Sequence, residues 1–426
     1  MYLRNVQWPD DQDALLRHIL QVHGPTDCDL LAAWYGTTPR FDPADYFVVE
    51  NDDGTEIIAH VGVVPRLVQI GQSLFTAGEI AFFGVLDSHQ DQGIEPALLD
   101  IAHDRMVARG DALGLVLGTP NFYEAWQYEY AVGLYLTSYE SDIPTDLALK
   151  AGHWDLQHAY ERRTADRLGV RSRPLTVRRF YLSDLPAVMA LYQAESRAGH
   201  SILARDEETW LWQLDYMTRI GRNEPDDFLV VEIENQIAGY IRLVTDTPLN
   251  WFREAEAARF SVIEAAGSDP DAIEALLAET ARLAQTFNAR RIGLFVHPAS
   301  QFARHALARG ASFRSFTGAG FMRVHNLPLA VQQLGPELEA RRLASPYAGR
   351  AFRLVITTEH DQAEIELGHG TPEPVELEVP ATAFVRLLSG WYGIDHLNAG
   401  YLARHDDLLR VLFPRRDPKI GLADLI

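Results

Sequence analysis

The stretch that decides the fold is Ile-Ala-Phe-Phe-Gly-Val-Leu (Ile80–Leu86), followed by the polar loop Asp87–Glu95 and a helical pattern that begins at Pro96. An apolar strand therefore leads, through a loop whose glycine is Gly93, into a helix. This order brings unpaired backbone N–H groups and the positive end of a helix dipole to one point. Because such a point binds anions, the stretch predicts an anion site at the start of the helix.

The sequence on either side of this stretch predicts an α+β unit. Tyr46–Glu50 and Ile57–Val64 flank an Asn-Asp-Asp-Gly turn and read as a hairpin. Further strands, a long helix, a strand and a short helix follow at Arg66–Ile70, Glu79–Leu86, Pro96–Gly110, Leu113–Leu117 and Phe122–Tyr128. The apolar face expected for the long helix consists of Ala97, Leu98, Ile101, Ala102, Met106 and Val107.

The same order of elements recurs about 180 residues later, which indicates a second copy of one domain. The second set of patterns is a strand at 176–180, a helix at 182–197, a hairpin at 227–233 and 236–243, a strand at 258–264, and then Pro270–Phe287 (helix), Arg291–Val296 (strand) and Ser300–Arg309 (helix). A segment rich in arginine, residues 161–179, separates the two sets and reads as a solvated linker.

From Leu327 onward the pattern predicts a smaller α+β domain. Its expected strands are Phe352–Thr357, Gln362–Gly368 and Val375–Val379, and its expected helices are Pro380–Ser389 and Asp395–Leu412. We therefore expect three domains, at residues 1–155, 156–326 and 327–426. The apolar helix in the last of these could line a cavity of lipid size, or it could be an ordinary core helix.

The charge balance excludes several classes of partner. The 426 residues include 38 basic and 59 acidic ones, for a net charge of −21. Such a surface repels nucleic acid and anionic lipid and attracts amines. Because no stretch approaches 18 uncharged apolar residues, we expect no membrane segment and a cytoplasmic location.

Residue types exclude further chemistries. Only Lys150 and Lys419 are lysines, so the chain has no GxxxxGK phosphate loop. Cys28 is the single cysteine; it lies between two aspartates, which predicts a raised pKa and an inert loop thiol. The 15 histidines show no HExxH spacing, and no GxSxG elbow is present, so we expect neither a metal site nor a hydrolytic serine.

Residues from Ile57 to about Gly133 resemble the GCN5-related N-acetyltransferase (GNAT) fold, and more narrowly its enhanced-intracellular-survival (Eis) branch. The family's His-Arg-Arg-Arg-Gly loop corresponds to the run from His89 to Gly93, and its tyrosine to Tyr123, with Tyr128 at the following aromatic position. That branch combines two tandem GNAT domains, the second degenerate, with a C-terminal domain similar to sterol carrier proteins.

The resemblance implies transfer of an acyl group, with acetyl as the expected one, from a coenzyme A thioester to a primary amine of a cationic small molecule. It implies no metal. Tyr123 would be the general acid, the backbone of Val85 would contact the thioester oxygen, and the terminal carboxylate at Ile426 would be the base, with Glu79 as a substitute. The cofactor-binding residues that it implies are Phe83, Gly84, Val85, Gln90, Asp91, Gln92, Gly93, Ile94 and Glu95. It also implies a homo-oligomer, of which a hexamer is one form.

The loop departs from the family pattern in its charge. The arginines are absent, and Asp91 and Glu95 add two negative charges where the family binds a pyrophosphate. Each carboxylate about 6 Å from a phosphate costs roughly 1–3 kcal/mol at effective dielectric constants of 20–80. The two acids can instead stabilise the helix N-terminus and point to solvent. Two hypotheses therefore stay open: an N-acetyltransferase, and a catalytically silent GNAT protein that acts as a scaffold or as a small-ligand or lipid binder.

Overall fold

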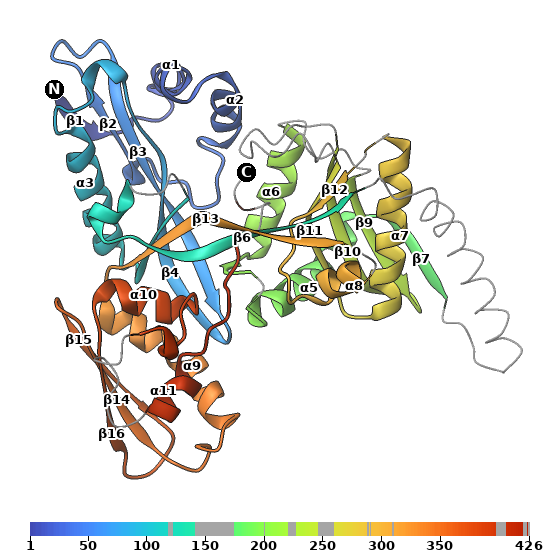
Figure 1. The fold of residues 1–426 in the computed structure, drawn as a ribbon. Helices are drawn as coiled ribbons and strands as arrows, with labels where there is room; N and C mark the ends of the chain where they lie inside the picture. Colours follow the sequence, from blue (N-terminus) through green and yellow to red (C-terminus); the bar gives the residue numbers. More distant parts are fainter. Residues whose placement is uncertain are drawn as a thin grey trace, which may run out of the picture.

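The computed structural model describes residues 1–117, 122–140, 174–199, 201–219, 227–245, 260–287, 289, 291–308, 311–397, 406–420 and 424. Within these residues the chain has a mixed α+β fold with one sheet of thirteen strands and one of three. Figure 1 shows the large sheet extending across two lobes, with the small sheet in a third region below the first lobe. The α+β class predicted from the sequence is confirmed.

The first part of the large sheet is an antiparallel meander that ends in a parallel pair. Strands β1 to β4 each pair antiparallel with the next, and β4 pairs in parallel with β5. The bounds are β1 (Tyr2–Asn5), β2 (Tyr46–Glu50), β3 (Ile57–Ile70), β4 (Ser73–Val85) and β5 (Leu113–Val116). A two-residue strand, β8 (Leu203–Ala204), pairs with β3 from far along the sequence.

Helices cover both faces of this part of the sheet. Because side chains alternate along a strand, Tyr46 and Val48 of β2 pack on one face, and Phe47 and Val49 on the other. The first face carries α1 (Gln12–His23) and α2 (Pro25–Trp34), and the second carries α3 (Ile94–Arg109). Each face thus has a core of its own, with the strands between the two.

The second part of the large sheet repeats this order. Strands β7, β9, β10 and β11 pair antiparallel, and β11 pairs in parallel with β12. The bounds are β7 (Leu175–Arg179), β9 (Phe228–Ile233), β10 (Gln236–Thr245), β11 (Phe260–Gly267) and β12 (Arg291–Leu294). The helices are α5 (Leu185–Arg197), α6 (Glu207–Arg219), α7 (Pro270–Thr286) and α8 (Gln301–Ala308).

Two long strands join the two parts into one sheet. They are β6 (Glu129–Glu140) and β13 (Ser312–Val324), which pair antiparallel with each other. The end of β13 also pairs with β5, and the end of β6 pairs with β12. Figure 1 shows these two strands crossing together from the first lobe to the second. Each lobe is therefore completed by a strand that also belongs to the other.

The C-terminal part has its own small sheet with the order β15-β14-β16. Its strands are β14 (Phe352–Thr357), β15 (Gln362–Leu367) and β16 (Glu373–Glu378), and its helices are α9 (Leu327–Leu343), α10 (Ala381–Ser389) and α11 (Asp406–Leu412). Helix α9 contacts both β15 and β4, so this part rests on the end of the first lobe. Their buried residues form one continuous core.

The tail after α11 returns to the junction between the two lobes. Gly133 of β6 donates its N–H to Pro418 and accepts one from Ile420, at 2.9 and 3.1 Å. The carbonyl of Lys419 accepts the N–H of Ile202, at 2.9 Å. The tail is therefore bonded to β6 on one side and to the segment before β8 on the other. This course brings Asp424 to the space between the lobes.

Several boundaries differ from the sequence-based prediction. Strand β3 runs without a break through Pro65. In α3, the predicted face is wrong at Val107, which is 58% exposed, and at Ala97, which is also exposed. The helix predicted over Asp395–Leu412 is wrong at its start, because Leu397 has extended backbone angles. Helices α1, α2 and α6 were not predicted. Residues 161–173 of the predicted linker lie outside the described residues.

Candidate active site

Strand β4 carries a β-bulge at the point where the sequence predicted a site. The register between β3 and β4 shifts there, so Phe82 and Phe83 together lie opposite Val61. Phe82 has a φ of 56°, a left-handed conformation that side chains with a bulky ring seldom adopt. A bulge bends its strand and increases the local twist. The end of β4, Gly84 and Val85, is therefore turned relative to the strand before it.

Beyond the bulge, one edge of β4 has no partner strand among the described residues. The parallel pairing with β5 ends at Ile80 and Val116, although β4 continues to Val85. The N–H of Leu86 donates to the carbonyl of Ile58 in β3, at 2.9 Å. Because successive N–H groups along a strand point in opposite directions, the N–H of Val85 points away from β3. The backbone thus presents a donor on the edge that β5 leaves open.

The loop after β4 is exposed and ends in a left-handed turn. Asp91 has a φ of 61° and Gly93 a φ of 78°, and α3 begins at Ile94. Gly93 is the N-cap of α3, and within the described residues no side-chain capping bond is found at the start of this helix. The N–H groups of the first turn and the positive end of the helix dipole lie where the sequence predicted an anion site, and that site stays a prediction.

Most polar side chains of the loop bond within the loop. Gln90 donates to Asp87 at 2.9 Å, Gln92 donates to the carbonyl of Ser88 at 3.3 Å, and Ser88 contacts His89 at 2.9 Å. These contacts lie on the chain before the helix. They hold the loop in shape without using the N–H groups at the start of α3.

The two acids of the loop do not fill the anion site. The side chain of Asp91 is exposed and that of Glu95 is half-buried. Within the described parts of the chain, neither carboxylate accepts a hydrogen bond from a backbone N–H of α3. Their effect on a bound phosphate is therefore electrostatic, and it is weakened by solvent.

Tyr123 lies across from the end of β4 on a short 3₁₀ helix, Tyr123–Trp126. Its side chain is 8% exposed, and its ring lies 6.4 Å from that of Phe83, measured between centroids. Burial raises the pKa of Tyr123 to about 12. The phenol is thus protonated at neutral pH and can donate a proton. Tyr128 is completely buried in the core behind it, and burial raises its pKa further.

The two candidate bases, Glu79 and the carboxylate at Ile426, and the nearby Asp424 differ in what the structure shows of them. Glu79 is 6% exposed and forms an ion pair with Arg66 at 2.5 Å. Asp424 is buried and accepts hydrogen bonds from Arg205 and Gln213, at 2.7 and 3.1 Å. Burial alone would raise the pKa of Asp424, but the neighbouring Arg205 guanidinium outweighs it and lowers that pKa. Ile426 lies outside the described residues.

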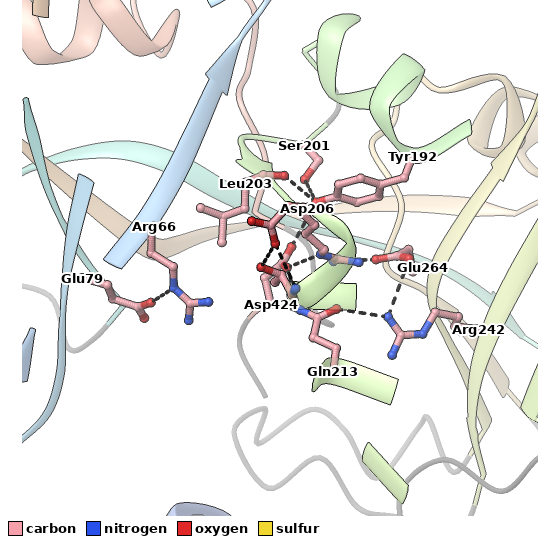
Figure 2. Close-up of polar contacts among 12 residues, drawn as sticks. Arg66, Glu79, Tyr192, Ser201, Leu203, Asp206, Gln213, Arg242, Glu264 and Asp424 are labelled. Carbon is pink, nitrogen blue, oxygen red and sulfur yellow. Dashed lines mark hydrogen bonds and ion pairs between the residues drawn. The ribbon is translucent and has the colours of Figure 1, made fainter. Parts of the chain in front are cut away.

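A pocket opens between the two lobes next to these carboxylates. We call it the α2–α6 pocket, and it is lined by Trp34, Thr38, Pro39, Arg40, Pro65, Arg66, Leu67, Leu203, Ala204, Arg205, Thr209, Trp212 and Asp424. Figure 2 shows Arg66 and Glu79 on the side of the first lobe, facing Asp424 and Gln213. The ring of Trp34 packs edge-on against Phe82, with 4.3 Å between centroids. The pocket therefore borders the bulge of β4.

A network of buried charges lies behind the pocket. Arg205 bridges Asp424 and Glu264, with 2.6 Å to the latter, and Arg242 lies 3.7 Å from Glu264. The hydroxyl of Tyr192 lies 3.5 Å from Asp424 (Figure 2). Paired in this way, the buried charges fix the end of the chain against the second lobe.

This geometry agrees with a comparison of the sequence to known families. Residues 3–131 match the family model described as the acetyltransferase (GNAT) domain. The similarity to this family covers the first lobe of the chain. No curated protein sequence matches the chain.

Solved structures resemble the whole chain and not the acetyltransferase domain alone. A GCN5-related N-acetyltransferase from Kribbella flavida has 16% identity and a TM-score of 0.66, with 98% of this chain and 97% of that chain covered. A probable N-acyltransferase of unknown function from Enterococcus faecalis V583 has 11% identity and a TM-score of 0.68, with coverage of 99% and 98%. Eis1 from Mycobacterium abscessus has 16% identity and a TM-score of 0.60, with coverage of 99% and 98%. At these identities the likeness establishes the fold.

Two exclusions made from the sequence can be compared with the described residues. No helix among them is long and apolar enough to cross a membrane. They also contain no group of three or more histidine, cysteine, aspartate or glutamate side chains arranged to hold a metal ion. Cys28 lies in helix α2 and not in a loop, and its pKa is raised by burial and by Asp29.

Sequence reasoning placed the residues around the acetyltransferase loop but missed the α2–α6 pocket. Trp34, Arg66 and Trp212 lie on three elements that are far apart in the sequence. The pairing of β3 with β8, which brings them together, involves two residues on each strand. No motif marks so short a contact. The sequence feature that could have pointed to this pocket was the acidic residue Asp424 near the end of the sequence.

Proposed function

We propose that the chain is an acyl-CoA-dependent N-acyltransferase that moves an acetyl group from acetyl-CoA to a primary amine of a small molecule that is cationic at neutral pH. The observation that carries the proposal is the combination of the β4 bulge with an open strand edge beside the N-terminus of α3. The match of residues 3–131 to the acetyltransferase family model supports it.

The residues fit the parts of such a substrate. The backbone N–H groups of Gln92, Gly93 and Ile94 would bind the pyrophosphate, because they meet at the start of α3. Phe83, Gly84 and Val85 would lie along the thioester arm on the open edge of β4. The backbone N–H of Val85 would donate to the carbonyl oxygen as negative charge develops there.

Transfer requires two proton movements. The amine nitrogen forms a bond to the thioester carbon, and the carbon–sulfur bond breaks. Tyr123 would protonate the departing sulfur, and its raised pKa of about 12 keeps the phenol protonated at neutral pH. The amine must first lose a proton. The resemblance assigns its acceptance to the carboxylate at Ile426. Glu79 is the weaker candidate, because its carboxylate is already bonded to Arg66.

Release of free coenzyme A tests the proposal. The chain is mixed with acetyl-CoA and a panel of primary amines that includes polyamines and amino acids, and the thiol is measured. We expect release that depends on an amine and falls about a hundredfold or more in Tyr123→Phe. Tyr130→Phe removes the same hydroxyl from a half-buried ring on β6 and is the matched control. Absence of release with every amine would refute the proposal and favour a scaffold or binding role.

A further inference from the structure

The α2–α6 pocket contains more positive than negative side chains. Its charged lining residues are three arginines, Arg40, Arg66 and Arg205, and one aspartate, Asp424. Asp424 already accepts hydrogen bonds from Arg205 and Gln213. The other carboxylates that pair with these arginines, Glu79, Asp206 and Glu264, are not among the residues that line the pocket.

The three arginines differ in how many of their hydrogen-bond donors are already used. Arg40 bonds to Asp206 at the rim, and Arg205 bridges Asp424 and Glu264 behind the wall. Arg66 uses its Nε for Glu79 at 2.5 Å. Among the described residues, no acceptor is found for the two terminal nitrogens of Arg66, whose side chain is 12% exposed. In Figure 2 these nitrogens point away from Glu79, toward the space between the lobes.

Next to Arg66, the pocket also has apolar surface that an apolar group of a ligand could contact. Trp34 lies beside Arg66, with 5.8 Å from the guanidinium carbon to the ring centroid. Trp212 faces it from α6, with 6.0 Å between the ring centroids. Leu67 and Leu203 add apolar surface to a lining that also contains polar residues such as Thr38 and Thr209. Because Trp34 also packs on the bulge residue Phe82, an occupant of the pocket lies next to the proposed acyl site.

We infer that the acceptor of the proposed transfer carries a carboxylate as well as its amine, and that Arg66 binds this carboxylate through its two terminal nitrogens. A planar guanidinium with two free donors matches the two oxygens of a carboxylate. The ion pair with Glu79 fixes the plane of the guanidinium before the ligand arrives. The acceptor class is thus an amino acid or a related zwitterion with an apolar or aromatic side chain. This inference rests on the proposed transfer to an amine, and it replaces the net cationic acceptor with a zwitterion in which only the amine is positively charged.

Binding of a simple carboxylate without acetyl-CoA tests the inference separately from catalysis. The probes are 3-phenylpropionate and its neutral amide, 3-phenylpropionamide, titrated by calorimetry and by the fluorescence of the pocket tryptophans. We expect the carboxylate to bind at least about tenfold more tightly than the amide, as hydrogen bonds to a charged group imply. A millimolar dissociation constant is the range expected for a ligand of this size.

Variants locate the binding at Arg66. Arg66→Gln with Glu79→Gln removes both charges of the pair and leaves no buried charge alone, and it should abolish the preference for the carboxylate. Glu79→Gln alone keeps the guanidinium and should retain or increase the preference. Arg40→Gln is the control for a rim arginine and should change it little. Circular dichroism of each variant checks folding.

Three results would overturn the inference. They are equal binding of carboxylate and amide, a preference that survives in the double variant, and no binding of 3-phenylpropionate up to about 10 mM. A failure of the proposed function gives a different result, because acetyl-CoA would then fail to bind while the carboxylate preference at Arg66 remained. A folded Arg66→Lys variant should retain part of the preference for the carboxylate, because lysine keeps the positive charge but lacks the two parallel donors of the guanidinium.

Discussion

The substitution Asp424→Asn should detach the C-terminal tail from the second lobe. The side chain of Asp424 is 1% exposed and accepts a hydrogen bond from Arg205 at 2.7 Å. Removing one partner from a buried ion pair typically costs about 3–5 kcal/mol. Asparagine keeps an acceptor oxygen, and Arg205 keeps Glu264 at 2.6 Å, so we expect the lower end, about 3 kcal/mol.

Hydrogen exchange measures this loss at the tail itself. The N–H groups of Ile202 and Ile420 bond the tail to the two lobes, and both should exchange about a hundredfold faster in Asp424→Asn. Asp206→Asn is the matched control, because the Asp206–Arg40 pair is exposed and contributes about 1 kcal/mol or less. If both variants change exchange by the same small factor, Asp424 does not anchor the tail.

The same anchor gives a pH dependence with a defined sign. Burial raises the pKa of Asp424, but Arg205 outweighs it, so the pKa in the folded protein lies below the ordinary 3.8. A group with a lowered folded pKa stabilises the fold above its unfolded pKa and loses that contribution as pH falls through the folded value. Tail amides should therefore keep their protection down to about pH 4 and lose it below.

Three further predictions concern the acetyltransferase domain. Tyr123→Phe should lower kcat by about a hundredfold or more and leave acetyl-CoA affinity unchanged, whereas survival of kcat within about threefold would remove the general-acid role. Asp91→Asn with Glu95→Gln should tighten acetyl-CoA binding about two- to tenfold at low salt, with a smaller effect at high salt; equal affinity at all salt concentrations would show that the acids do not act on the phosphates. Burial, and then Arg323, lowers the pKa of His103 to about 4, so its contribution of about 3 kcal/mol is present above pH 6.5 and is lost as pH falls toward 4. His103→Gln should flatten the dependence of the unfolding midpoint on pH in that window, and an unchanged slope would contradict the assignment.

The strand, loop and helix that carry the site could be predicted because their signals are local. The apolar run Ile80–Leu86, the glycine at 93 and Gly110 at the end of the helix each act through neighbouring residues. The recurrence of the same order of strands and helices around β9 to β12 could also be predicted, because it depends on hydrophobic periodicity alone. A tendency of this kind survives in the fold because no tertiary contact opposes it.

Other features depended on contacts that sequence does not display. Pro65 suggested a break in the strand, yet β3 continues through it, because pairing with β2 ends at Gly62 and pairing with β8 begins at Leu67. On that edge no neighbour requires the missing N–H of proline. The apolar Val107 was expected inside, but within the described part of the chain no element buries that side of α3. Its exposure is 58%.

The candidate site was predicted in its backbone and missed in its side chains. Gly93 lies at the helix start that the pattern implied, and Val85, which the resemblance named, lies on the open edge of β4. Arg66 and Trp212 come together only because β8 pairs with β3 and carries α6 to the first lobe. Such a pairing of two residues at long range leaves no mark on composition or periodicity.

The most direct test of the account is a calorimetric titration of the whole chain with acetyl-CoA. The start of α3 offers unpaired backbone N–H groups, and neither Asp91 nor Glu95 is bonded to them within the described residues. We therefore predict binding with a micromolar dissociation constant that tightens when the two acids are neutralised. No binding at millimolar acetyl-CoA, with the chain folded, would contradict the acyltransferase assignment and favour the scaffold or binding role.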